Sequence, residues 1–132
     1  AIEPNGLRAA SLFSGCGGSS LGYRMAGFTM VYANEFIEAA RDTYKANASE
    51  GTYLDDRDIR SVSGRDILDL VGEVDLLDGS PPCSSFSTAG KREKQWGKEK
   101  KYSATVKDGD VGSVQRTDDL FFEYARILRT VR

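Results

Sequence analysis

The chain has 132 residues, of which 39% are hydrophobic and 29% are charged, with 14 glycines and 3 prolines. This composition is typical of a single globular domain and excludes a disordered or collagen-like protein. No apolar run approaches the ~18 residues needed to cross a bilayer. The first residues, AIEPNGLRAA, lack a secretory signal pattern, so we expect a cytoplasmic protein.

Two residue types limit the available chemistry. The only cysteines, Cys16 and Cys83, cannot build a disulfide framework, and the absence of histidine argues against a zinc site. Without histidine, the chain also lacks every Ser-His or Cys-His catalytic pair. Any nucleophile must therefore be activated in another way.

The net charge of −2 is unevenly distributed. Residues 1–90 carry 7 basic and 13 acidic side chains, whereas residues 91–132 carry 11 and 7. Most of the basic excess lies in 91–107, where Trp96 and Tyr102 are interleaved with the charges. Such a stretch either follows a phosphate backbone or forms a solvated surface loop.

Apolar runs alternate with helical spacing along the chain, which predicts an α/β fold with a parallel sheet. The first half is predicted to contain a strand over 7–13, a helix capped by Ser19 or Ser20 that ends near Ala26, a strand over 29–34 and a helix over 36–47. The second half is predicted to contain a strand-like segment near 52–59, a short helix over 66–71, a strand over 74–78, a loop over 84–116 and a final helix. In the final helix, Thr117 is the expected cap, and one apolar face is formed by Leu120, Phe121, Tyr124, Ile127, Leu128 and Val131.

The first strand leads into a glycine turn, Phe13-Ser-Gly15-Cys-Gly-Gly18, that can cradle a nucleotide-like ligand at a helix N-terminus. Glu35 directly follows the second strand, where a carboxylate can accept both ribose hydroxyls, although it also suits the first turn of a helix. Asp58 is either an acceptor for an adenine amino group or a surface charge. Neither a dinucleotide fingerprint nor a P-loop lysine is present, which favours S-adenosylmethionine over NAD.

Cys83 lies in the turn Gly79-Ser-Pro-Pro-Cys83-Ser after the predicted strand over 74–78. In an open parallel sheet, this turn faces the same crevice as the glycine turn. An isolated cysteine is commonly a buried small hydrophobe, but these flanking turn residues favour a reactive thiol. Cys16, in contrast, is expected only to pack.

Taken in order, FSGCGG, Asn34-Glu35, Asp58-Ile59, PPCSSFSTAGKR and the final DDLFFEYARIL resemble the cytosine-C5 DNA methyltransferases from about Leu7 to Val131. The resemblance implies a Rossmann-like, S-adenosylmethionine-dependent methyltransferase fold, without a metal, in the cytoplasm of a prokaryote or phage-like source. It implies a cofactor pocket, with S-adenosylhomocysteine as the product, formed by Phe13, Gly15, Gly18, Glu35, Phe36, Asp58, Ile59, Pro82 and Leu120.

By the same resemblance, Cys83 would be the nucleophile that adds to C6 of a cytosine flipped out of double-stranded DNA. Residues 84–116 would form a mobile catalytic loop with DNA contacts from Ser84, Ser87, Lys91 and Arg92. Ser84 departs from the glutamine often found after this cysteine, and the stretch between Cys83 and Leu120 is longer than usual.

The resemblance also suggests that residues 1–132 are the N-terminal portion of one catalytic domain, without the target-recognition region and the Glu-Asn-Val glutamate. We therefore expect the chain alone to be deficient in catalysis, and its last predicted strand to favour self-association or a complementing C-terminal chain. Two alternatives stay open: a tRNA cytosine-5 methyltransferase, and a non-catalytic S-adenosylmethionine-binding or complementing subunit.

Overall fold

A four-stranded parallel sheet forms the centre of the molecule, with the strand order β3-β2-β1-β4. The computed structural model describes residues 1–82, 99–101, 114–116 and 119–131. The strands are β1 (Arg8–Leu12), β2 (Thr29–Asn34), β3 (Tyr53–Asp55) and β4 (Leu76–Gly79). All neighbouring strands run parallel, as the alternating sequence pattern predicted.

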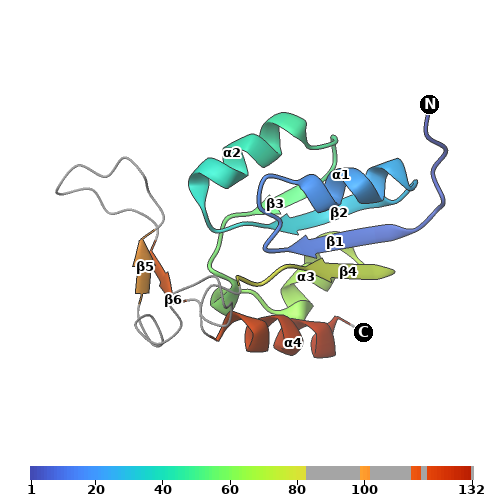
Figure 1. The fold of residues 1–132 in the computed structure, drawn as a ribbon. Coiled ribbons are helices and arrows are strands. Elements are labelled where there is room, and N and C mark those ends of the chain that lie inside the picture. Colours follow the sequence, from blue (N-terminus) through green and yellow to red (C-terminus); the bar gives the residue numbers. More distant parts are fainter. Residues whose placement is uncertain (83–98, 102–113, 117–118, 132) are drawn as a thin grey trace, which may run out of the picture.

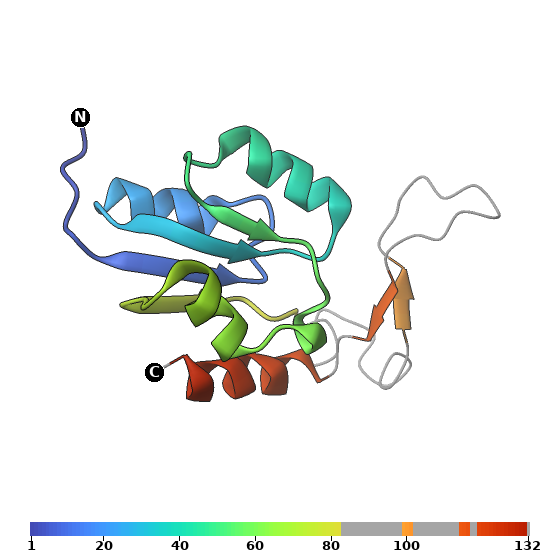
Figure 2. The ribbon, with the colours of Figure 1, turned by 180° about the vertical axis from the view of Figure 1, so that it is seen from behind.

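Helices cover both faces of this sheet. They are α1 (Gly18–Met25), α2 (Glu38–Asn47), the 3-10 helix η1 (Ile59–Ser61), α3 (Gly64–Val71) and α4 (Leu120–Thr130). Figures 1 and 2 show α1 and α2 on one side of the sheet and α3 and α4 on the other. None of the helices in the described ranges has the length and apolar character to cross a membrane.

The central strands are buried because helices cover them on both faces. Ala9, Ala10 and Leu12 of β1 are fully buried, and so is Tyr32 of β2. The core cluster continues from β1 and β2 into Ile59, Val62, Ile67, Leu120, Ile127 and Val131. The short apolar runs of the sequence therefore become the middle of the sheet.

The start of α1 differs from the expected serine cap. Gly17 occupies the N-cap position with φ +94°, and no side chain caps the helix. Ser20 is buried, and its hydroxyl accepts a hydrogen bond from the Tyr44 hydroxyl at 3.0 Å. The left-handed glycine thus begins the helix earlier, and Ser20 serves to join α1 to α2.

Two further boundaries move for local reasons. Helix α2 begins at Glu38 rather than at Phe36, because the Ile37 N–H is bonded to the Glu35 side chain at 2.9 Å. Strand β3 is only Tyr53–Asp55, because the chain then turns into η1, where Asp58 accepts the Arg60 N–H at 3.0 Å. Asp58 is therefore a helix cap rather than the end of a strand.

The expectation of a plain loop over 84–116 is wrong. This segment contains β5 (Glu99–Lys101) and β6 (Val114–Arg116), which pair antiparallel. The two three-residue strands, EKK and VQR, are too short and too polar to show alternation. The rest of the segment, for which mobility was expected, lies outside the described residues.

Helix α4 buries fewer apolar side chains than its pattern predicts. Leu120 and Ile127 are fully buried, whereas Phe121 and Leu128 are 59% and 40% exposed. Asp119 occupies its N-cap position without a side-chain capping bond, and the expected cap Thr117 lies outside the described residues. The side of α4 that meets the core is therefore narrower than the apolar face expected from the sequence.

Candidate cofactor site

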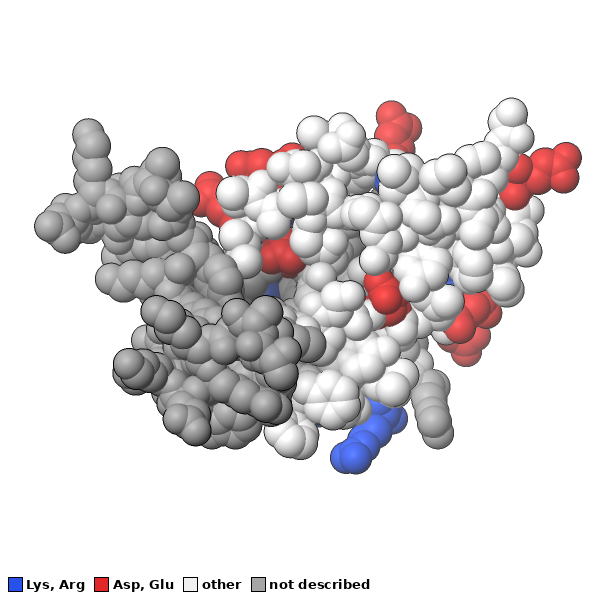
Figure 3. Space-filling view, viewed as in Figure 1, with Lys and Arg blue, Asp and Glu red and all other residues white. Residues whose placement is uncertain are grey.

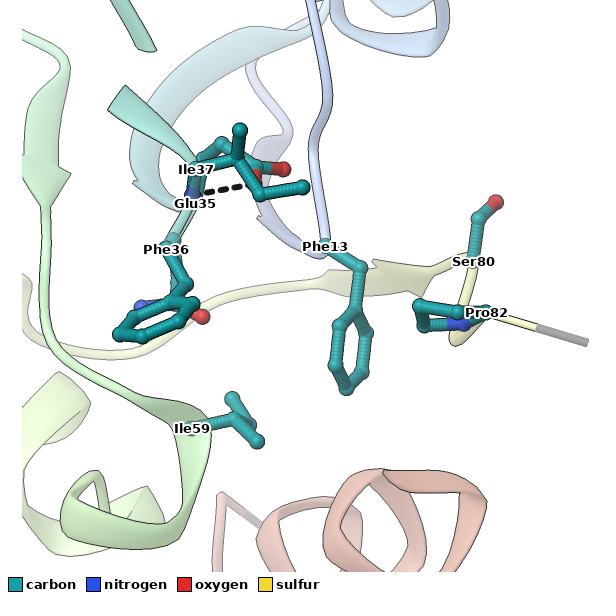
Figure 4. A pocket seen from close by; sticks show the side chains of 8 residues that line it. Phe13, Glu35, Phe36, Ile37, Ile59, Ser80 and Pro82 are labelled. Atoms are coloured by element: carbon teal, nitrogen blue, oxygen red, sulfur yellow. Dashed lines mark hydrogen bonds between the residues drawn. The ribbon is translucent and has the colours of Figure 1, made fainter. Parts of the chain in front are cut away.

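A pocket opens where β1, β2 and β4 end, beside η1. Its lining residues come from the segments that follow these strands, and they are Phe13, Asn34, Glu35, Phe36, Ile37, Ile59, Ser80 and Pro82. Figure 4 shows the side chains of Phe13, Phe36, Ile59 and Pro82 around the space, each from a different segment. Ligands of open parallel sheets bind at this end of the strands.

Glu35 is the acidic group of this pocket, and its side chain is held in place by two backbone groups. Its Oε2 accepts the Gly15 N–H at 2.7 Å, and its Oε1 accepts the Ile37 N–H at 2.9 Å. The residue is only 7% exposed. Because a carboxylate offers about four acceptor positions, about two stay available for the hydroxyls of a ribose. These acceptor positions, within apolar walls, fit an adenosine group.

The glycine turn has an unusual backbone that brings its atoms against Glu35. Phe13 has φ +53°, in the left-handed region that glycine normally occupies, and Gly15 has φ +56°. Such a conformation costs a non-glycine residue about 1–3 kcal/mol. The Ser14 N–H donates to the Asn34 carbonyl at 3.0 Å, which fastens the turn to the end of β2. The turn thus presents the Phe13 ring to the pocket and the Gly15 N–H to Glu35.

Glycine is required at position 17 by packing as well as by φ. A Cβ on Gly17 would lie 2.9 Å from the ring of Tyr44, closer than real contacts allow. A Cβ on Gly18 would meet no atom within 4 Å, so that position is open to the outside at the start of α1. Gly18, the last residue of the glycine turn, does not line the pocket.

A buried hydrogen-bond network supports the loop between β3 and η1. The Tyr32 hydroxyl donates to Asp55 at 2.8 Å, and Arg57 pairs with the same carboxylate at 2.7 Å. The Asn34 side chain donates to the carbonyls of Asp55 and Arg57 at 3.3 and 2.9 Å. Burial, together with the hydrogen bond to Asp55, raises the pKa of the Tyr32 hydroxyl.

The same network lowers the pKa of the Asp55 carboxyl. Burial acts to raise this pKa, but the hydrogen bonds from Arg57 and Tyr32 outweigh it. A carboxyl with a lowered pKa in the folded chain stabilises the fold above its unfolded pKa of about 3.9. That contribution is lost as the pH falls through the folded pKa.

Replacing Asp55 by Asn is therefore expected to lower the free energy of unfolding by about 2 kcal/mol at pH 7. The difference in free energy of unfolding between the variant and the unaltered chain should shrink as the pH falls below about 4. Urea unfolding at several pH values measures it, and Asp56→Asn is the matched control because Asp56 is exposed. An equal loss of stability at pH 7 and pH 2.5 would contradict the ionic role of Asp55.

The structure brings together five of the residues expected at the cofactor site: Phe13, Glu35, Phe36, Ile59 and Pro82 line the pocket. Four others, Gly15, Gly18, Asp58 and Leu120, lie outside the lining. Gly15 reaches the site through its N–H bond to Glu35, Asp58 precedes the lining residue Ile59, and Leu120 is fully buried in the same core cluster as Ile59. Leu120 is thus a core residue rather than an exposed wall of the pocket.

The sequence prediction missed three lining residues, Asn34, Ile37 and Ser80. Ser80 carried a usable signal, because it lies in the turn that follows a predicted strand. The expected nucleophile and DNA contacts lie outside the described residues, and these are Cys83, Ser84, Ser87, Lys91 and Arg92. The described residues contain no group of three or more His, Cys, Asp or Glu that could hold a metal ion.

The expectation that Cys16 only packs is wrong. Cys16 is a free, exposed cysteine. It lies at a second hollow between α1 and α2, which Arg24 and Tyr44 also line. Cys16 lies in the turn between β1 and α1, and it lines this hollow instead of joining the core.

The charge of the described surface agrees with the uneven distribution in the sequence. On the face shown in Figure 3, acidic side chains are more prominent than basic ones among the described residues. The basic stretch 91–107 lies almost entirely outside those residues. The described surface in this view therefore offers no basic patch for a phosphate backbone.

The parallel sheet, the strand order and the pocket at the strand ends define the class: a Rossmann-like fold of the S-adenosylmethionine-dependent methyltransferases. The chain matches the family of C-5 cytosine-specific DNA methylases over residues 7–132. The protein therefore belongs to this family, which confirms the resemblance seen in the sequence.

Individual relatives agree with this assignment. The chain is 36% identical over 126 residues to the type II methyltransferase M.NgoPII of Neisseria gonorrhoeae, covering 96% of this chain and 30% of the relative. A structure of Spodoptera frugiperda DNMT2 is 27% identical with a TM-score of 0.61, covering 92% of this chain and 31% of that one. An E. coli prophage-encoded DNA modification methyltransferase shares the fold, at 23% identity with a TM-score of 0.66, covering 95% and 29%. The chain thus spans about 30% of the length of the relatives that it matches.

Proposed function

We propose that this chain carries the S-adenosylmethionine pocket and the nucleophile of a DNA (cytosine-5)-methyltransferase of a restriction–modification system. The observation that supports it best is the Glu35 carboxylate, held by the Gly15 and Ile37 N–H groups within an apolar pocket. An acidic group with unused acceptor positions at the end of β2 suits the hydroxyls of a ribose. The absence of a G-x-G-x-x-G fingerprint from the sequence favours S-adenosylmethionine over a dinucleotide.

In this proposal, Glu35 binds the ribose hydroxyls, and the apolar walls enclose the adenine. Phe13, Phe36, Ile59 and Pro82 supply those walls. Asp58 and the backbone of Ile59 would recognise the edge of the adenine. The bound cofactor supplies a methyl group on a sulfonium, with S-adenosylhomocysteine as the product.

Cys83 would be the nucleophile, and it follows the pocket residue Pro82 directly in the chain. Its thiolate would add to C6 of the cytosine, and the displaced electron pair would make C5 able to take the methyl group. Loss of the C5 proton and cleavage of the bond between sulfur and C6 would then release the thiolate. The base must first leave the DNA stack, and Ser84, Ser87, Lys91 and Arg92 would contact the DNA around it.

DNA is favoured over RNA as the substrate by two observations. The matched family is described as a DNA methylase, and the curated relatives are type II methyltransferases. A cytosine in tRNA is the competing substrate, and a cofactor-binding subunit without its own catalysis is the competing function. Both alternatives can be distinguished by covalent trapping.

The trapping experiment uses duplex DNA in which every cytosine is 5-fluorocytosine, because the target sequence is unknown. Fluorine at C5 cannot leave as a proton, so the enzyme stays bound to its substrate. We expect an adduct that requires S-adenosylmethionine and is absent in Cys83→Ser, seen by denaturing electrophoresis and mass spectrometry. An adduct formed only with fluorinated RNA would replace DNA as the substrate. Cofactor binding without any adduct, also when a complementing C-terminal chain is added, would indicate the non-catalytic subunit.

We also propose that full turnover needs more chain, in the same polypeptide or from a complementing chain. The relatives are about three times as long as the matched region. Within the described residues, β4 pairs only with β1, so its other edge is open to a further strand. If the 132-residue chain sustained methyl transfer and light scattering showed it to be a monomer, this requirement would be contradicted.

A further inference from the structure

Helix α4 and the residue before it are tied to the η1 region by two arginines, one on each segment. Arg126 of α4 donates to the carbonyls of Ile59 and Val62 at 3.0 and 2.7 Å. In the other direction, Arg60 of η1 pairs with Asp119, the residue before α4. These bonds join segments about 60 residues apart in the sequence.

Arg60 also contacts Asp58, the residue that precedes the pocket residue Ile59 in the chain. The Arg60 backbone N–H donates to Asp58 Oδ1 at 3.0 Å, and its guanidinium lies 3.4 Å from both carboxylate oxygens. The Asp58 side chain is only 28% exposed and the Arg60 side chain 30%. Ile59, between them in the chain, is 1% exposed and lines the pocket.

One guanidinium therefore spans two carboxylates, those of Asp58, next to Ile59 in the chain, and of Asp119, directly before α4. A planar guanidinium holds its partners in a fixed geometry, which a flexible single charge does not. Within the described residues, Arg60 is the basic side chain that contacts the Asp58 carboxylate. Its orientation thus depends on Arg60 and on the backbone of η1.

We propose that Arg60 is a positioning residue that orients Asp58 toward the adenine and is itself held by Asp119. This inference rests on the proposed function, because it takes Asp58 as the acceptor for the adenine amino group. It assigns to Arg60 a part in recognising adenine rather than the ribose. It also makes the start of α4 a support for the adenine end of the pocket.

The test compares S-adenosylhomocysteine with S-inosylhomocysteine, in which an oxygen replaces the amino group. By calorimetric titration, Arg60→Gln should weaken S-adenosylhomocysteine binding about tenfold, because an unsupported carboxylate accepts the amino group less well. Binding of the inosyl compound should stay unchanged or improve, since its oxygen gains nothing from an oriented Asp58. The preference for adenine should thus fall by about the same factor.

Arg65→Gln is the matched control, because Arg65 forms an exposed pair with Asp69 within α3. Asp119→Asn should reduce the preference in the same direction but by less, and it keeps the test possible if Arg60→Gln does not fold. Arg60→Lys should keep part of the preference for S-adenosylhomocysteine over the inosyl compound. An equal loss for both compounds, or no loss for either variant, would overturn the positioning role. If the unaltered chain binds neither compound, the proposed cofactor site itself is refuted, and this inference with it.

Discussion

Glu35→Gln is expected to weaken binding of S-adenosylhomocysteine by about 100-fold or more. The carboxylate accepts the N–H groups of Gly15 and Ile37, one on each oxygen. A glutamine amide has only one oxygen, so one of these N–H groups would face an NH₂ group instead of an acceptor. The variant also loses the charge that strengthens hydrogen bonds from the ribose hydroxyls.

Calorimetric titration of the 132-residue chain measures this loss directly. Glu38→Gln is the matched control, because Glu38 is exposed in the first turn of α2 and only three residues away. It should bind as the unaltered chain does. If Glu35→Gln kept its affinity while remaining folded by circular dichroism, Glu35 would not be the ribose acceptor.

Gly79→Ala should produce the largest loss of stability among the glycine substitutions near the pocket. A Cβ at position 79 would lie 2.4 Å from two ring atoms of Tyr124. The ring cannot move freely, because its hydroxyl donates to the Leu77 carbonyl at 3.1 Å in the same strand. Overpacking of this kind costs about 3 kcal/mol, which corresponds to a fall of roughly 10 °C in Tm.

Thermal unfolding followed by circular dichroism tests this expectation. Gly22→Ala is the matched control, since no atom lies within 4 Å of its added Cβ in the middle of α1. That variant should gain about 0.5–1 kcal/mol from helix propensity. When Tyr124 is replaced by Leu, adding Gly79→Ala should lower the stability much less, because the ring is absent. The same loss of stability with and without the Tyr124 ring would mean that the ring is not the cause.

The sequence was most informative where burial alone decides the structure. The runs that became β1, β2 and β4 are apolar and bounded by glycine or polar residues, so their existence could be predicted. Their ends were less predictable, because specific side chains set them. Helix α2 begins late since Glu35 binds the Ile37 N–H, and α1 begins early since Gly17 adopts a left-handed φ.

Within the site, the residues that follow strands were predictable, and those that depend on contacts between strands were not. Phe13 and Glu35 come directly after β1 and β2, so their place follows from parallel strand order. Asn34 binds the carbonyls of Asp55 and Arg57 only because β2 and β3 pair with Asn34 opposite Asp55. A register of this kind is a property of the folded sheet and leaves no local pattern in the sequence.

The left-handed backbone of Phe13 places folding and ligand binding in opposition at one residue. Glycine at this position would relax the backbone, but it would remove an aromatic wall of the pocket. A search for more stable variants would therefore select against the ring, and a search for tighter cofactor binding would select for it. Position 13 is where engineering this chain for stability alone would erode its affinity for a ligand.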